Sequence, residues 1–274
     1  MLIFGLGYTA GRLAERLRAE GWSVAGTSRD GRDGTIAFDD VARMRAELAA
    51  ATHVLSSAPP DDAGDPALAR YGDALAGQWL GYLSSTGVYG DVGGAWVDES
   101  APVGGGRRRA RAEADAAWLG RDARVFRLPG IYGPGRSALE RIAEGRAHRV
   151  AAPRQVFSRI HVDDIVSGVI AGFAAPPGAY NLADDLPASQ NDVIDFAARL
   201  LRTASPPVVP LDALPAAAQG FYAENRRVAN GKAKRVLGWT PRFPDYRAGL
   251  RALSATSRPI SVSTPPAAAS SVQR

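Results

Sequence analysis

The chain has 274 residues, 46% of them hydrophobic, which is enough for one large α/β domain or two small ones with a substantial core. It contains no cysteine, which excludes disulfides, thiol catalysis and cysteine-ligated metal sites, and its three histidines lack metal-ligand spacing, so we expect no metal. The formal net charge of +5 arises from arginines spread among acids, so charge alone does not single out a nucleic-acid partner.

The first element is a short apolar strand followed at once by a glycine-rich turn. Met1–Phe4 is the strand, and Gly5–Ala10 (GLGYTA) matches the dinucleotide pattern G-x-G-x-x-[GA] before a helical stretch. Gly5 permits the tight turn, Gly7 lets the backbone approach a pyrophosphate, and Ala10 lets the helix pack closely on the strand. The helix then points its free N–H groups at the phosphates. A glycine-rich turn without a ligand is the alternative. The turn residues expected to bind a cofactor are Gly5, Gly7, Tyr8, Thr9 and Ala10.

Apolar runs alternate with helical patterns along the chain. This alternation predicts βαβ units and a doubly wound parallel sheet of the NAD(P)-binding Rossmann type, with the ligand beyond the carboxyl ends of the strands. Strands are expected at 1–4, 23–27, 35–38, 53–57, 79–84 and 124–128. Helices are expected at 8–20, 41–50, 65–77, 107–119, 137–144, 164–173, 190–201 and 230–237.

The end of the second strand distinguishes NAD from NADP. An acid there would bind the ribose 2′-hydroxyl, but this chain has Ser28 and Arg29. A hydroxyl and a guanidinium suit a 2′-phosphate, so we expect NADP(H) to be preferred, with NAD(H) as the alternative. Asp30 weakens this prediction because it could pair with Arg29, and Arg29 could also be an ordinary exposed loop arginine.

Later strand ends supply further cofactor contacts. Small residues after the fourth strand suit close passage of the cofactor ribose, and the end of the sixth strand should border the nicotinamide. Asp39 follows the third strand, where it would contact the adenine or cap the helix that begins near Val41. These further predicted cofactor residues are Asp39, Ser57, Ala58, Pro59, Pro129 and Gly130.

The segment Leu83–Gly90 (LSSTGVYG) resembles the fifth-strand motif of the extended short-chain dehydrogenase/reductases, the nucleotide-sugar epimerase and dehydratase group. Matches continue in the same order to about residue 250, and the chain is most similar to an atypical bacterial, epimerase/dehydratase-like branch. The other matching segments are Trp96–Glu99, Arg127–Arg136, Arg159–Asp164, Tyr180–Ala183 and Leu237–Pro241.

The resemblance implies hydride transfer between substrate and nicotinamide. In that family a strand-end serine or threonine orients the substrate oxygen, and a Tyr-x-x-x-Lys pair supplies the proton. The serine position falls on Ser85, with Thr86 beside it; a backbone hydrogen bond at the strand end is the alternative role for Ser85.

The Tyr-x-x-x-Lys pair is missing from this chain. When the family pattern is laid on residues 105–113, Gly105 replaces the tyrosine and Arg109 replaces the lysine. A guanidinium stays protonated, so Arg109 cannot act as an acid, although it could hold the ribose. Tyr89, Tyr132 or a water molecule could supply the proton, but packing is the commoner role for Tyr89. The candidate catalytic residues are therefore Ser85, Thr86, Tyr89 and Arg109.

These observations indicate an NADP(H)-dependent oxidoreductase or epimerase-like protein acting by hydride transfer on a carbonyl, sugar or imine. Because the proton donor is missing, a non-catalytic NADP(H)-binding sensor is the alternative. A weaker hypothesis is nucleic-acid binding by the arginines of 107–111. Such clusters more often lie on a solvent-exposed helix face, so we expect no nucleic-acid partner.

We expect a dinucleotide-binding core at 1–128 and 156–183, a small substrate lobe at 129–155 and 184–254, and a disordered tail at 255–274 that is rich in Ser, Pro and Ala. No apolar stretch approaches membrane-spanning length, and Met1 leads into a core strand rather than a signal peptide. We expect a cytoplasmic protein with a small-molecule substrate and no membrane contact. The sequence leaves open whether the chain forms a homodimer.

Overall fold

The computed structural model of the chain describes residues 1–106 and 109–256. The tail expected to be disordered begins at residue 255, but residues 255 and 256 still belong to the last helix, α10 (Tyr246–Thr256). The rest of that tail, 257–274, lies outside the described residues, as do Arg107 and Arg108.

A seven-stranded sheet forms the centre of the molecule, in the order β11-β7-β5-β4-β1-β2-β3, and every pairing in it is parallel. The strand order reverses between β1 and β4, which is where ligands bind in doubly wound sheets. The predicted fold class is confirmed. The strands are β1 (Leu2–Phe4), β2 (Ala25–Ser28), β3 (Ile36–Ala37), β4 (His53–Ser56), β5 (Trp79–Ser85), β7 (Arg124–Leu128) and β11 (Gly178–Asn181).

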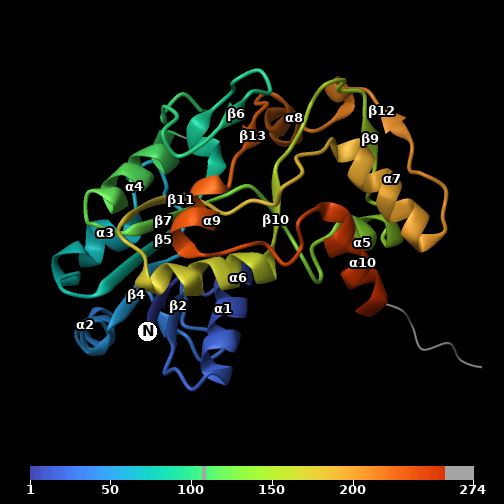
Figure 1. Cartoon of the computed structure of the whole chain (residues 1–274). Coiled ribbons are helices and arrows are strands. Elements are labelled where there is room, and N and C mark those ends of the chain that lie inside the picture. Colours follow the sequence, from blue (N-terminus) through green and yellow to red (C-terminus); the bar gives the residue numbers. More distant parts are fainter. Residues whose placement is uncertain (107–108, 257–274) are drawn as a thin grey trace, which may run out of the picture.

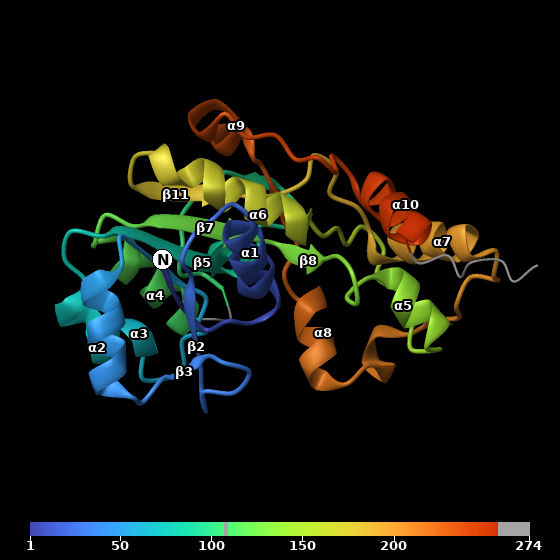
Figure 2. The same ribbon diagram turned by 90° about the horizontal axis from the view of Figure 1, so that it is seen from below.

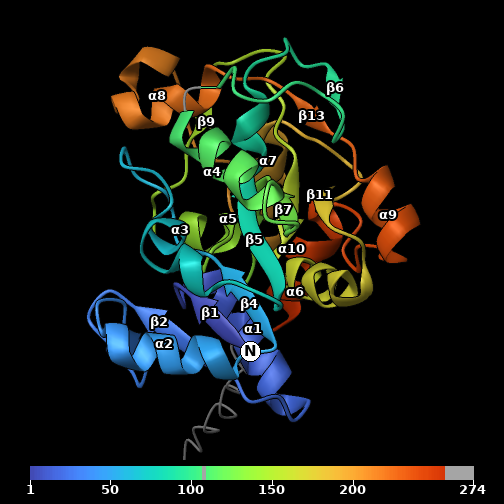
Figure 3. The ribbon, with the colours of Figure 1, turned by 90° about the vertical axis from the view of Figure 1, so that its left-hand side faces the viewer.

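Helices cover both faces of the sheet because alternate strand residues point to opposite sides. Ile3 faces one apolar core and its neighbours Leu2 and Phe4 face the other. Figure 3 shows α6 and α9 on one side of the sheet and α3 on the other. The first core packs against α1 (Tyr8–Ala19), α6 (Val162–Ala171) and α9 (Gly231–Leu237). The second packs against α2 (Val41–Ala50), α3 (Pro66–Tyr71) and α4 (Arg109–Leu119).

A smaller lobe lies at one end of the molecule (Figures 1 and 2). Its own apolar core joins α5 (Ala138–Ala143), α7 (Gln190–Leu201) and α10, and α8 (Ala216–Tyr222) lies apart from these three helices. Three two-stranded parallel sheets also occur among the described residues. They pair β8 (Gly130–Tyr132) with β10 (Arg159–His161), β9 (Arg149–Val150) with β12 (Val208–Val209), and β6 (Trp96–Val97) with β13 (Arg227–Val228).

Several helix boundaries differ from the sequence prediction by a few residues, and the helices α8 and α10 were not predicted. The helix expected at 65–77 ends as α3 at Tyr71 and continues as the 3-10 turn η1 (Gly72–Ala74). The helix expected from residue 164 begins at Val162, because the His161 side chain caps it by accepting the Asp163 N–H at 3.2 Å. The other 3-10 turns are η2 (Thr86–Tyr89), η3 (Gly172–Ala174) and η4 (Leu211–Ala213).

Within 1–106 and 109–256, no helix is long and apolar enough to cross a membrane. The same residues contain no group of three or more histidines and carboxylates placed to hold a metal ion.

Candidate dinucleotide and substrate site

The Gly5–Ala10 turn leads from β1 into α1 at the switch point of the sheet. Gly5 has φ +78°, and a Cβ there would lie 3.1 Å from the Ala58 backbone nitrogen, so only glycine fits. Gly7 is the N-cap of α1 without a side-chain cap, and a Cβ on it would meet nothing within 4 Å. Ala10 is fully buried beneath the turn. The turn therefore leaves free backbone N–H groups facing open space at a helix N-terminus, which fits a pyrophosphate.

The loop after β2 is organised by Ser28. Its hydroxyl donates to Asp30 Oδ1 at 3.1 Å and accepts the Gly31 N–H at 2.9 Å. Asp30 lies 3.9 Å from Arg32 Nε, and Arg29 is exposed and makes no ion pair with any residue that the structure describes. Asp30 therefore does not neutralise Arg29, whose guanidinium is free to meet an anion at this strand end.

Asp39 lies beyond the end of β3. Its carboxylate pairs with Arg70 at 2.8 Å and stays 74% exposed. The expectation that Asp39 could cap the next helix is wrong, because Asp40 caps α2 by accepting the Arg43 N–H at 3.1 Å. Contact between Asp39 and an adenine stays a prediction.

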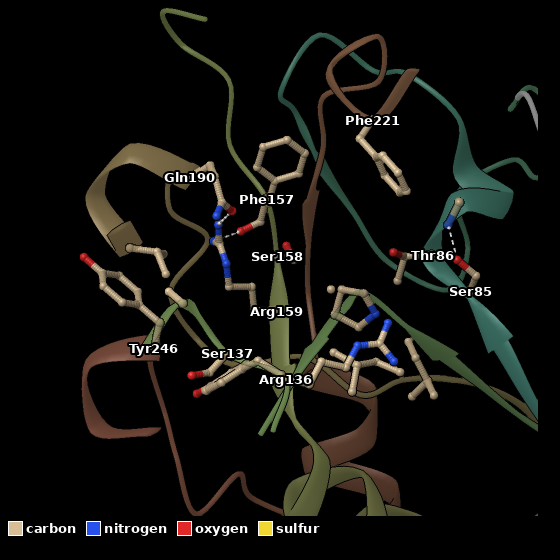
Figure 4. Close-up of a pocket in the computed structure, with 18 of the residues that line it drawn as sticks. Ser85, Thr86, Arg136, Ser137, Phe157, Ser158, Arg159, Gln190, Phe221 and Tyr246 are labelled. Carbon is tan, nitrogen blue, oxygen red and sulfur yellow. Dashed lines mark hydrogen bonds between the residues drawn. The ribbon is translucent and has the colours of Figure 1, made fainter. Parts of the chain in front are cut away.

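A cavity of about 1000 Å³ opens beyond the carboxyl ends of the central strands. Figure 4 shows Ser85, Thr86 and Phe221 on one side and Ser137, Arg159, Gln190 and Tyr246 on the other. The cavity brings together seven of the predicted residues: Tyr8, Thr9, Ser57, Ser85, Thr86, Pro129 and Gly130. The remaining cofactor candidates, which do not line it, are Gly5, Gly7, Ala10, Ser28, Arg29, Asp39, Ala58 and Pro59.

Ser85 ends β5 and begins η2. Its Oγ accepts the Gly87 N–H at 3.1 Å, which is the backbone hydrogen bond expected of a strand-end serine. A hydroxyl keeps its own proton when it accepts, so Ser85 can still donate toward a ligand. Thr86 is only 4% exposed and also lines the cavity, so two hydroxyls lie side by side at its wall (Figure 4).

A buried polar network holds this wall in place. Arg127, on β7, binds Asp115 of α4 through two hydrogen bonds of 3.1 and 2.7 Å, and the two side chains are 3% and 0% exposed. Ser84 donates to the same carboxylate at 2.6 Å. Tyr89 accepts from Arg127 at 3.0 Å and donates to Asn181 at 2.7 Å. The network therefore joins β5, α4, β7, η2 and β11.

Tyr89 and Tyr132 are poorly placed as proton donors. The Tyr89 hydroxyl is held inside the buried network and does not line the cavity, and burial raises its pKa. Tyr132 does line the cavity, but its hydroxyl is 3.5 Å from the Asp245 carbonyl oxygen, and burial raises its pKa strongly. Neither phenol has the lowered pKa that general-acid or base catalysis near neutrality needs.

Arg111, which the sequence reasoning missed, reaches the site instead of Arg109. Arg111 lines the same cavity as Ser85 and donates to the Tyr82 hydroxyl at 2.8 Å. It lies one turn before the anchored Asp115, on the same helix face. Arg109 is about 200° around the helix from Arg111. It is 88% exposed, paired with Glu113 and not among the residues that line the cavity, and its contact with the ribose stays a prediction.

The arginines of 107–111 therefore do not act as one basic face within the described chain. Arg109 faces solvent, Arg111 faces the cavity, and Arg107 and Arg108 lie outside the described residues. The glycines before them pass directly over η2. Gly104 donates its N–H to the Val88 carbonyl at 2.8 Å, and a Cβ on Gly106 would clash with the Gly87 carbonyl oxygen.

Comparison with known proteins includes a relative that matches nearly the whole chain. No family model matches the sequence. A functionally unknown conserved protein from Silicibacter pomeroyi is 42% identical, with a TM-score of 0.86 over 93% of this chain and 98% of that one. A curated relative, the 3-diazoavenalumate denitrifying reductase of a Streptomyces species, is 29% identical over 150 residues. The match covers 51% of this chain and 48% of that reductase, so the chain spans about half of its length.

More distant solved structures share the fold. UDP-glucose 4-epimerase of Thermus thermophilus, solved with NAD, has a TM-score of 0.72 and 18% identity over 93% of this chain and 98% of its own. Human epimerase family protein SDR39U1, solved with NADPH, has a TM-score of 0.71 and 17% identity over 93% and 99%. The resemblance to extended short-chain dehydrogenase/reductases is thus confirmed at the level of the fold.

Proposed function

Because this chain belongs to the same family as the Silicibacter pomeroyi protein and has the fold of epimerase-like short-chain dehydrogenase/reductases, we propose that it is an NADP(H)-dependent oxidoreductase. It acts by hydride transfer on a carbonyl, sugar or imine. One observation carries the proposal: residues from the β1, β4, β5 and β7 ends line the same cavity. Tyr8 and Thr9 come from the glycine turn, and Ser85 and Thr86 from the opposite wall.

The glycine turn and the end of β2 support the proposed cofactor site. The open backbone at Gly7 and the uncapped N-terminus of α1 suit a pyrophosphate. Arg29 has no ion pair within the described residues, so its guanidinium can bind a 2′-phosphate. This supports NADP(H) over NAD(H).

The proposed substrate site is formed by Ser85, Thr86 and Arg111. When bound, the nicotinamide supplies or accepts the hydride. Ser85 and Thr86 donate hydrogen bonds to the polar atom of the substrate and orient it. Arg111 stays protonated and places a fixed positive charge at this wall, which stabilises negative charge that develops on the substrate.

The chain lacks a phenol with a suitable pKa at this wall. Burial raises the pKa of both Tyr89 and Tyr132, and neither hydroxyl is free. The site therefore suits a carbonyl whose developing negative charge lies near Arg111 and is protonated by water, or an iminium, which needs no proton when it accepts hydride. The likeness to a reductase over half of that protein's length supports reduction rather than epimerisation.

The test measures cofactor binding and hydride transfer separately. NADPH and NADH are titrated by fluorescence, and deuteride transfer from 4-deuterated NADPH is followed by mass spectrometry over a panel of carbonyl and imine compounds. Ser85→Ala should lower turnover roughly a hundredfold while NADPH affinity stays nearly unchanged, because the hydroxyl acts mainly in the transition state. Unchanged turnover would remove Ser85 from this role.

A second candidate is a non-catalytic NADP(H) sensor, favoured by the absence of the Tyr-x-x-x-Lys pair from the whole sequence. It predicts tight NADPH binding, no deuterium in any product, and a partner whose affinity differs between NADP⁺ and NADPH.

A further inference from the structure

The lobe end of the cavity, away from the glycine turn, carries features that the proposed hydride transfer does not use. Aromatic side chains line it, and its charged side chains are mostly arginines. The side chains that matter are Phe157, Phe221 and Tyr222 for the walls and Arg141 and Arg226 for the charges. The inference below rests on the proposed function and concerns what this end of the cavity selects.

Three aromatic rings line this end. Phe157 and Tyr222 pack edge to face, with ring centroids 5.4 Å apart and an interplanar angle of 89°. Phe221, the neighbour of Tyr222 on α8, is 56% exposed, and Figure 4 shows it across the cavity from Phe157, on the side of Thr86. Exposed apolar rings that line a cavity are a common feature of binding sites for planar apolar groups.

Most arginines at this end are already engaged. Arg226 pairs with Glu224 at 2.9 Å and donates to the Gly90 carbonyl at 2.7 Å. Arg159 donates to the carbonyls of Phe157 and Ala188, each at 2.8 Å. Arg146 is paired with Glu144. Carboxylates thus offset the charges of Arg226 and Arg146, and Arg159, 7% exposed, directs its donors to backbone carbonyls.

Arg141 differs from them. It extends from α5 into the cavity and forms no ion pair with any residue in 1–106 or 109–256. Its charge acts on the Tyr222 hydroxyl: burial raises the pKa of Tyr222, and Arg141 opposes that rise. Arg136 is also without an ion pair there, but it lies over the Tyr8 ring, 5.7 Å from its centroid, at the glycine-turn end. Among the described residues at the lobe end, Arg141 is therefore the guanidinium without an ion pair or a side-chain hydrogen bond, and it shares the cavity with the aromatic wall.

We propose that the substrate carries an aromatic ring with one anionic group, an aromatic carboxylate being the simplest case. The ring packs among Phe157, Phe221 and Tyr222, and the carboxylate binds Arg141. A guanidinium matches a carboxylate with two parallel hydrogen bonds.

Equilibrium binding to the full chain, with and without saturating NADPH, tests the proposal. The probes are cinnamate, its uncharged methyl ester, and UDP-glucose, each measured by calorimetry. Cinnamate should bind roughly ten- to a hundredfold more tightly than the ester, because the ester lacks the charge-assisted hydrogen bonds. Arg141→Gln should abolish that preference, and Arg43→Gln, an exposed arginine on α2, is the matched control that should retain it. Phe221→Ala should weaken acid and ester by about the same factor.

The outcomes separate this inference from the proposed function. Three outcomes would overturn the inference and leave the proposed function standing, provided that NADPH still binds tightly. Cinnamate and its ester would bind equally well, neither would bind, or UDP-glucose would bind more tightly than cinnamate. Arg141-dependent binding of cinnamate to a protein that binds no NADPH would support the inference and overturn the proposed function. A cinnamate preference that survives Arg141→Gln would overturn the assignment of Arg141.

Discussion

The buried pair between Asp115 and Arg127 makes the sharpest prediction, because it determines which face of α4 meets the cavity. In Asp115→Asn the carboxylate charge is removed while the side-chain volume is kept. Arg127, 3% exposed, would then be a buried cation without its counter-charge, and the 2.6 Å hydrogen bond from Ser84 would lose its charged acceptor. Breaking one side of a buried pair costs about 3–5 kcal/mol of the free energy of unfolding.

The assay is urea unfolding followed by circular dichroism and tryptophan fluorescence. For a chain of this size the expected loss is also a fall in melting temperature of roughly 6–20 °C. The matched control lies on the same helix: Glu113→Gln breaks the exposed pair with Arg109, whose side chains are 88% and 56% exposed, and should cost about 1 kcal/mol or less. Equal losses in the two variants would refute the reasoning.

A second variant guards against a general effect of substitution in the core. Asp115→Leu alone should be as damaging as Asp115→Asn, or worse. Adding Arg127→Met should recover part of that loss, because no charge then stays buried without a partner. A double variant less stable than Asp115→Leu would mean that Arg127 acts mainly through Tyr89 and not through Asp115.

Three further predictions follow from the site and the lobe. Arg29→Asp should reduce the preference for NADPH over NADH by roughly tenfold or more, because it replaces a charge-assisted hydrogen bond with repulsion; an unchanged affinity ratio would contradict the 2′-phosphate assignment. Arg111→Ala should lower kcat/KM for deuteride transfer by roughly a hundredfold, and Arg109→Ala should leave it nearly unchanged. The reverse order would support Arg109 in the position of the family's lysine, as expected from the sequence. Burial raises the pKa of Asp184 from 3.8 to about 8. Between these two pH values the carboxyl group is protonated in the folded protein and ionised in the unfolded chain. The free energy of unfolding should therefore fall as the pH rises across this window. Asp184→Asn should flatten that fall in urea unfolding measured from pH 4 to pH 8, and an identical slope would mean that Asp184 is ionised in the folded protein.

Local sequence patterns determined the sheet and much of the cofactor end. The turn at Gly5–Ala10 was predictable because its small residues are required by backbone geometry: Gly5 has a positive φ and lies against Ala58. The strands were predictable because apolar runs alternate with amphipathic helices, and strand ends in such a sheet converge on one edge. Ser85 and Thr86, which follow the fifth of the expected strands, were predicted from the resemblance of Leu83–Gly90 to the short-chain dehydrogenase/reductase motif.

Only the tertiary structure decided which arginine of α4 lines the cavity. Aligning the family pattern with the sequence uses only the spacing of residues along the helix. The rotation of α4 about its axis depends instead on the buried contact of Asp115 with Arg127, twelve residues away on β7. That contact turns Arg111 toward the cavity and Arg109 toward solvent. Tyr89 is engaged in the same network, and the lobe end assembles from α5, α8 and the segment before β10. No local pattern encodes these long-range contacts, because each depends on where distant elements pack.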